Sequence, residues 1–198
     1  MSIVSKRFLA YLVDMFLVFV VVFLLKSVMP VNKYENELAN LNEAYLEKNV
    51  ESNEYISQLK IITHNIDKED IVINIVATLF IIVIFVIVPN YNNGQTLGQK
   101  LLKIKISKDK PLKMDDLVGR AVIINGLGYM IFMFLILYLT SDNVYFILIN
   151  LLGFFQILMV IINGFMVIYS KEKRGIADRF TDTRIEEIKW KKYLAWFF

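Results

Sequence analysis

Four long apolar segments divide this chain of 198 residues, and they constrain its fold more than any other feature. They lie at about residues 8–28, 71–88, 121–139 and 145–169. A helix crosses the hydrocarbon core of a bilayer with roughly 20 apolar residues. The hydrophobic content of 57% also exceeds the roughly 45–50% of a typical soluble domain. The sequence therefore predicts an all-α membrane protein with four transmembrane helices, a single domain over residues 1–198.

Charged residues are sorted by sign between the connections. Most Lys and Arg residues fall before the first span, in an inner loop at 89–120 and in the tail at 170–198, whereas acidic residues predominate at 30–70. Cytoplasmic loops of membrane proteins carry an excess of Lys and Arg. We therefore expect both termini in the cytoplasm and the acidic segment outside.

The acidic segment 30–70 carries apolar residues at helical spacing. They form two runs, separated by Asn49 and by Ser52-Asn53, which are residue types common at helix ends. The sequence predicts an extracytoplasmic helical pair here. This pair is either a solvated cap on the membrane domain or a surface that binds a partner.

The inner loop 89–120 opens with a turn pattern at 90–94 and then alternates apolar and basic residues at 103–107. These patterns predict a short cytoplasmic β-hairpin-like loop on the inner membrane face. Its lysines would contact anionic lipids, each contributing about 1 kcal/mol. The tail ends in Trp, Tyr and Lys residues at 189–198, which suit the headgroup zone, so we expect the tail 170–198 to lie on the cytoplasmic interface.

Asp14 lies inside the first apolar segment. A carboxylate near the centre of a span costs on the order of 2.5–3.5 kcal/mol on insertion scales, so such a residue is kept for a function or has a partner. Arg7 shares its helix face but lies roughly 10 Å away along the axis, too far for a direct ion pair. Asp14 therefore needs a partner from another helix, or water. Asp14 is therefore either a buried carboxylate that is bonded to a polar residue or the backbone for assembly, or a residue that binds an ion or a proton.

Other polar residues accompany the last two spans. Four amides lie within them: Asn125, Asn150, Gln156 and Asn163. Amides next to small residues commonly join membrane helices, so each is either a packing contact or part of a polar path. Asp178 falls at the inner interface with Arg7 and Arg120, and an Arg–carboxylate clamp there would pin the tail to the first helix.

Several function classes are disfavoured by composition. The chain has no Cys and one His, His64, which excludes thiolate chemistry and any site with several His ligands. It has no G-x-S-x-G and no phosphate-binding loop. We expect no enzyme activity, no cofactor, no metal site and no nucleic-acid partner.

Three groups of residues resemble the motifs of the RDD family of bacterial membrane proteins, named for one arginine and two aspartates. The first is Arg7-x-x-Ala10-x-x-x-Asp14, and the second is an inner-loop segment completed by Arg120 at the head of the third span. The third runs from Arg174 to Thr183 and contains Asp178, preceded by Ala177 where the family often has His. The inner-loop motif includes Gly94, Gln95, Thr96, Gly98 and Lys100.

The resemblance implies a multi-pass protein of the bacterial cytoplasmic membrane. Transport, including exchange of sodium for protons, has been suggested for some members of the family. We therefore hypothesise a transporter that exchanges monovalent cations for protons, with Asp14, Arg7 and Asp178 as candidate ion or proton sites and a homo-oligomer supplying further walls. The alternative is a non-transport adaptor, accessory or immunity protein that binds a partner through its outer helices.

Overall fold

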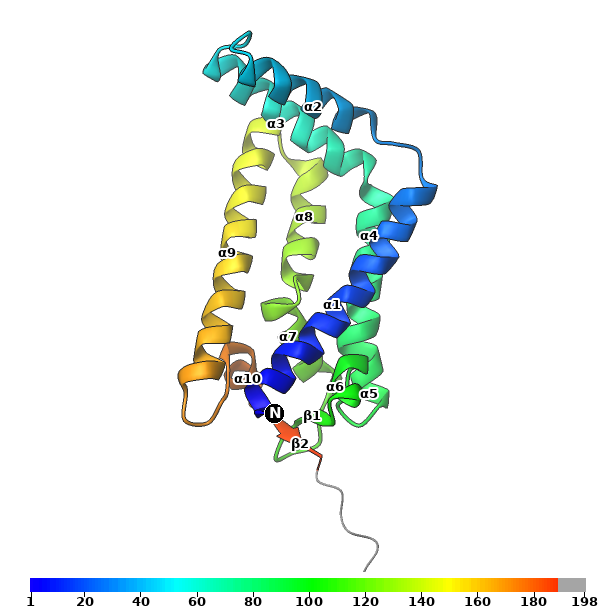
Figure 1. Cartoon of the computed structure of the whole chain (residues 1–198), viewed down its shortest axis with the longest axis vertical. Helices are drawn as coiled ribbons and strands as arrows, with labels where there is room; N and C mark the ends of the chain where they lie inside the picture. Colours follow the sequence, from blue (N-terminus) through cyan, green and yellow to red (C-terminus); the bar gives the residue numbers. More distant parts are fainter. Residues whose placement is uncertain (189–198) are drawn as a thin grey trace, which may run out of the picture.

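The computed structural model describes residues 1–188, and most of them are helical (Figure 1). Two short strands and one π-helical segment complete the fold. The elements are α1 (Ile3–Val28), α2 (Lys33–Leu46), α3 (Ser52–Glu69), α4 (Ile71–Ile82), η1 (Val83–Ile87), α5 (Val88–Tyr91), α6 (Leu97–Leu101), β1 (Ile104–Ser107), α7 (Met114–Ile124), α8 (Leu127–Leu139), α9 (Asp142–Tyr169), α10 (Ile176–Phe180) and β2 (Arg184–Glu187).

Long apolar helices dominate the described residues. Ile3–Val28, Ile71–Tyr91 and Asp142–Tyr169 are each long and apolar enough to cross a membrane, and the bent pair α7–α8 makes a fourth span if it is counted as one. Their outward faces expose large apolar side chains, such as Phe23 at 61% and Phe154 at 61%. Such surface is compatible with lipid and not with water. The chain is therefore a membrane protein.

The second span contains a local irregularity. Its backbone widens into the π-helical segment η1 before Pro89, and the helix then continues to Tyr91. Proline has no backbone N–H, so the regular hydrogen bond to the carbonyl four residues earlier cannot form. A π-helical turn accommodates the missing bond without ending the span.

The third span differs from the single helix expected at 121–139. Helix α7 begins at Met114 and ends at Ile124, and α8 continues after Asn125 and Gly126 at an angle of 73°. Gly126 has a φ of +78°, a left-handed conformation that costs glycine little. This residue therefore ends one helix and redirects the chain.

The prediction of a hairpin-like inner loop was wrong in its pairing. Strand β1 does form at the alternating residues, but it pairs with β2 of the tail in an antiparallel register that joins Ile104 to Glu187 and Ser107 to Arg184. Ile106 also donates a backbone bond to the Gly94 carbonyl, 2.7 Å away. The tail is thereby fixed beneath the inner loop up to residue 188. The expected interfacial position of 189–198 lies outside the described residues.

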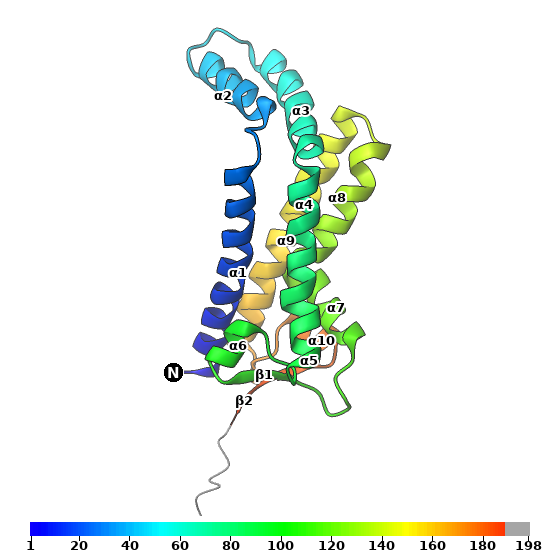
Figure 2. The same ribbon diagram turned by 90° about the vertical axis from the view of Figure 1, so that its right-hand side faces the viewer.

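The expected pair of amphipathic helices is present as α2 and α3. The two helices lie together at the end of the molecule opposite to the N-terminus and the sheet (Figures 1 and 2). Helix α3 runs into α4 with only Asp70 between them. The turn between α2 and α3 contains Lys48, whose φ is +61°.

Two clusters of buried apolar residues hold the helices together. The larger one joins α1, η1, α7 and the sheet, and it includes Ala10, Val86, Ile104 and Leu117. The smaller one joins α8 to α9 near the α3 end. Because the larger cluster lies at the sheet end, it positions the polar residues described next.

Candidate functional site

Asp14 is almost completely buried, with 1% of its side chain exposed. Thr96 donates its hydroxyl to Oδ2 at 2.5 Å, and the backbone N–H of Gly98 donates to Oδ1 at 2.7 Å. Both carboxylate oxygens therefore have a donor. These donors come from the inner-loop helix α6, not from another span.

Local sequence explains why α6 forms at this place. Thr96 and Gln99 make a reciprocal capping box, in which the Thr96 N–H donates to Gln99 Oε1 and the Gln99 N–H donates to Thr96 Oγ1. A Cβ on Gly98 would lie 2.2 Å from the Ala10 carbonyl oxygen, so only glycine lets α6 approach α1 this closely. A carboxylate at the start of a helix also interacts favourably with its free N–H groups.

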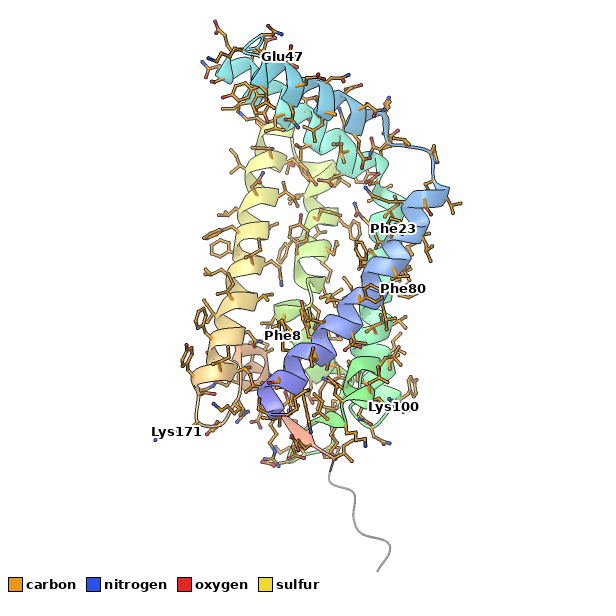
Figure 3. All side chains as sticks on the ribbon, in the orientation of Figure 1. Phe8, Phe23, Glu47, Phe80, Lys100 and Lys171 are labelled. Carbon is orange, nitrogen blue, oxygen red and sulfur yellow. The ribbon has the colours of Figure 1, made fainter. Side chains whose placement is uncertain are left out.

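The other residues of this motif hold the loop itself. Gly94 has a φ of +79°, and a Cβ there would lie 2.3 Å from the Ile106 carbonyl oxygen. Gln95 donates its amide to the Ile104 carbonyl at 2.9 Å. Lys100 is exposed at the lower end of the molecule (Figure 3).

A second buried carboxylate, Asp178, lies between two arginines. Its side chain has no exposed surface; Arg7 donates to Oδ2 at 2.6 Å, and Arg120 donates to Oδ1. The Gly175 N–H adds a bond to Oδ2 at 2.9 Å. The structure thus contains the hypothesised clamp between Arg7 and Asp178, and it adds Arg120 as a third member. We call these three residues the Arg–Asp–Arg cluster.

Charge explains the ionised state of this cluster. Burial alone would raise the pKa of Asp178, but the charges of Arg120 and Arg7 and the Gly175 N–H hold that pKa below its ordinary value. The cluster therefore contains two positive charges and one negative charge. Its net positive charge lies where α1, α7 and α10 meet.

The two carboxylates belong to different helices, Asp14 to α1 and Asp178 to α10. Within residues 1–188, no hydrogen bond or ion pair joins Asp14 to Arg7 or Asp178. The structure therefore does not bring the three candidate ion residues into one binding site. No group of three or more metal-ligating His, Cys, Asp or Glu side chains occurs in the part of the chain that the structure describes.

A cavity of about 300 Å³ lies between α1, α7 and α9. Arg7 and Arg120 of the Arg–Asp–Arg cluster line it, together with Asn125 and Asn163. Thr96, the hydroxyl partner of Asp14, also lines it. The cavity thus reaches both carboxylate environments.

The four amides have different surroundings. Asn125 and Asn163 line this cavity, and Asn163 Oδ1 accepts the Ala177 N–H at 3.2 Å. Gln156 borders an adjoining hollow and donates to the Ile123 carbonyl at 3.3 Å. Asn150 is exposed and donates to a carbonyl of its own helix, so it belongs to no shared polar path.

A third polar cluster, at the α3 end, was missed by the sequence reasoning. His64 is 1% exposed, its Nδ1 lies 2.6 Å from Asp142 Oδ1, and its Nε2 lies 2.7 Å from the Leu137 carbonyl oxygen. Its ring stacks on Tyr145, whose hydroxyl donates to Asp67 at 2.6 Å. Burial raises the pKa of Asp67. A lone His in an acidic segment gives no local signal of such partners.

The sequence model of the RDD family matches residues 2–182, a range that contains α1, the inner loop and the Arg–Asp–Arg cluster. No curated protein and no solved structure matches the chain. Because the match covers nearly the whole sequence, this chain belongs to the RDD family.

Proposed function

We propose that this chain is a small transporter of the bacterial cytoplasmic membrane that exchanges monovalent cations for protons at Asp14. The observation that carries this proposal is the burial of Asp14 inside an apolar span, next to a threonine that lines the cavity. A single carboxylate that holds either a proton or a cation, but not both, is the minimal element of an exchanger. Thr96 connects this carboxylate to the cavity, because it donates its hydroxyl to Asp14 and also lines the cavity.

The exchange would use the two hydrogen bonds of Asp14. Thr96 Oγ1 and the Gly98 N–H stabilise the ionised carboxylate. A proton on Oδ2 requires the Thr96 hydroxyl to rotate from donor to acceptor, and a cation at Oδ2 would be bound by the same hydroxyl oxygen. Arrival of either species therefore displaces the other and changes the contact between α1 and α6.

We further propose four crossings with both termini in the cytoplasm. Basic residues gather at the end with α6 and the sheet, where Lys100 and Lys171 lie, and Glu47 lies at the opposite end (Figure 3). This separation follows the positive-inside rule. A second copy of the chain would supply further walls for the path, as four helices are few.

A flux measurement in proteoliposomes tests the exchange. An outward proton gradient should drive uptake of sodium, potassium or lithium by the wild-type protein, and Asp14→Asn should abolish it because the amide cannot exchange a proton. The matched control is Asp115→Asn, which removes an exposed acid at the start of α7. Equal exchange by Asp14→Asn and the wild type would remove Asp14 from the mechanism, and no ion-driven proton flux by the wild type would reject the exchange itself.

The second candidate function is a membrane adaptor that binds a partner through its outer helices. Helix α2 packs on α3, and three exposed acids lie on α2 or directly after it, namely Glu37, Glu43 and Glu47. Deleting the whole segment is a poor test because α3 also carries buried His64. Replacing the three glutamates with lysines leaves the packed face intact, so it should abolish complementation of a deletion strain without lowering the amount of inserted protein. Full complementation would count against the adaptor.

A further inference from the structure

The cavity between α1 and α9 has a polar end and an apolar mouth. Phe8 of α1 and Ile168 of α9 line it although they are 62% and 50% exposed, so they belong to its rim. Helices α1 and α9 come closest near the sheet end and separate toward the outer helices (Figure 1). Both rim residues lie on apolar spans, near the helix ends next to the sheet, so the mouth would open near the boundary between headgroups and hydrocarbon in a membrane.

The polar end carries a net positive charge. Arg7 and Arg120 reach the cavity, and they share a single carboxylate, Asp178. Arginine in a water-poor site binds phosphate and carboxylate groups well, because its guanidinium group donates several hydrogen bonds in one plane. An anion next to this pair would complete the charge balance.

Asn125 adds an independent observation. Only 5% of the residue is exposed, and its Nδ2 has no hydrogen-bond partner among residues 1–188. Asn125 lines this cavity and the adjoining hollow. A buried amide donor without a partner is costly, and native proteins seldom keep one. This donor therefore lacks an acceptor that a ligand in the cavity would provide.

We infer that this cavity binds an amphiphile with an anionic head, namely a phosphate or carboxylate attached to a hydrocarbon chain. The head lies between the Asn125 amide and the two arginines, and the chain leaves through the mouth at Phe8 and Ile168. A volume of about 300 Å³ lies at the small end of ligand sites, so it holds the head and the first part of a chain while the rest stays in the bilayer. The inference does not depend on cation exchange at Asp14.

Native mass spectrometry and thermal unfolding of the full chain in a zwitterionic detergent test this site. The probes are phosphatidylglycerol, oleate, phosphatidylcholine and glycerol 3-phosphate. We expect phosphatidylglycerol or oleate to bind and raise the unfolding temperature, and the comparison of these two shows which anionic head the site takes. Phosphatidylcholine and chain-free glycerol 3-phosphate should bind at least tenfold more weakly.

Asn125→Leu separates ligand recognition from folding. This substitution removes the unpaired donor, so the ligand-free protein should unfold at the same temperature as the wild type or higher. Its affinity for the anionic amphiphile should fall about tenfold to a hundredfold, the effect of losing a hydrogen bond to an ionised group. The matched control is Asn150→Leu, which replaces an exposed amide outside the cavity and should leave the affinity unchanged.

Three results would overturn the inference. One is equal binding of phosphatidylcholine and phosphatidylglycerol, and another is undiminished binding by Asn125→Leu. The third is a lipid-free dimer in the same spectra that resists every probe, because a second copy would then cover the mouth. All three outcomes are independent of the flux measurement, so failure of this site and failure of the exchanger are distinguishable.

Discussion

Replacing Asp178 with Asn tests how strongly the Arg–Asp–Arg cluster holds the inner end together. The substitution keeps an oxygen for the Gly175 N–H but removes the one negative charge that faces two arginines. Breaking a buried ion pair by removing one partner costs about 3–5 kcal/mol. The cluster belongs to this class because the Asp178 side chain is fully buried and the Arg7 and Arg120 side chains are 13% and 8% exposed. Against a typical stability of about 5–15 kcal/mol, this is a large loss.

Thermal and urea unfolding of the purified protein in one detergent measure this loss. The matched control is Asp182→Asn, whose carboxylate pairs with Arg174 at 3.2 Å but is 76% exposed. An exposed pair contributes about 0–1 kcal/mol, so the control should unfold close to the wild type. A loss below about 1 kcal/mol for Asp178→Asn would show that the cluster does not stabilise the inner end as expected, because the two arginines would then have found other partners or water.

Exchanging the charges of Arg7 and Asp178 gives a further check on the same cluster. If the clamp had two members, the swapped pair would restore stability. Because Arg120 also bonds Asp178, the swap places a new arginine next to Arg120. We therefore expect no rescue, and recovery of wild-type stability would show that Arg120 is not a member.

Three further predictions concern other contacts. Gly98→Ala should cost about 1–3 kcal/mol of unfolding free energy, because its methyl group would collide with the Ala10 carbonyl, whereas Gly164→Ala has open space and should be neutral in the same unfolding assay. In the folded protein the pKa of Asp178 lies below the ordinary value of 3.8, so the ionised carboxylate stabilises the fold above pH 3.8 and this stabilisation is lost as the pH falls through the folded pKa. Unfolding temperatures measured from pH 6 to 3 should therefore drop for the wild type and change less for Asp178→Asn. His64→Phe removes the buried contact to the Leu137 carbonyl oxygen and should lower stability by about 1–3 kcal/mol in urea unfolding.

The spans could be predicted because their signal is local. Length and apolar content decide whether a segment suits a bilayer, and each segment carries that information by itself. The bend at Asn125 and Gly126 could not be predicted from local sequence in the same way. Apolar residues continue on both sides of it, and a glycine takes a left-handed conformation only when the surrounding helices favour the new direction.

The sheet and the Asp14 contact show which features a local sequence pattern does not predict. Alternation at 103–107 correctly indicated a strand, but its partner is a tail segment about 80 residues away, and alternation does not identify partners. Thr96 and Gln99 have the spacing of a capping box, which is readable in the sequence. That spacing does not identify the carboxylate that contacts the start of α6, which is Asp14.

The distance in sequence between paired groups has a consequence for how the protein is made. Asp14 and Thr96 are 82 positions apart, and Arg7 and Asp178 are 171 apart. At about 5–20 residues per second, the ribosome delivers these partners roughly 4–16 s and 9–34 s after their counterparts. Asp14 of helix α1 therefore lacks its hydrogen-bond donors until α6 has been made, and Arg7 lacks its carboxylate partner until α10 has been made. A copy released between residues 98 and 178 would contain both donors of Asp14 but would leave Arg7 without its carboxylate, so an incomplete chain differs from the finished one by an unpaired positive charge at the start of α1.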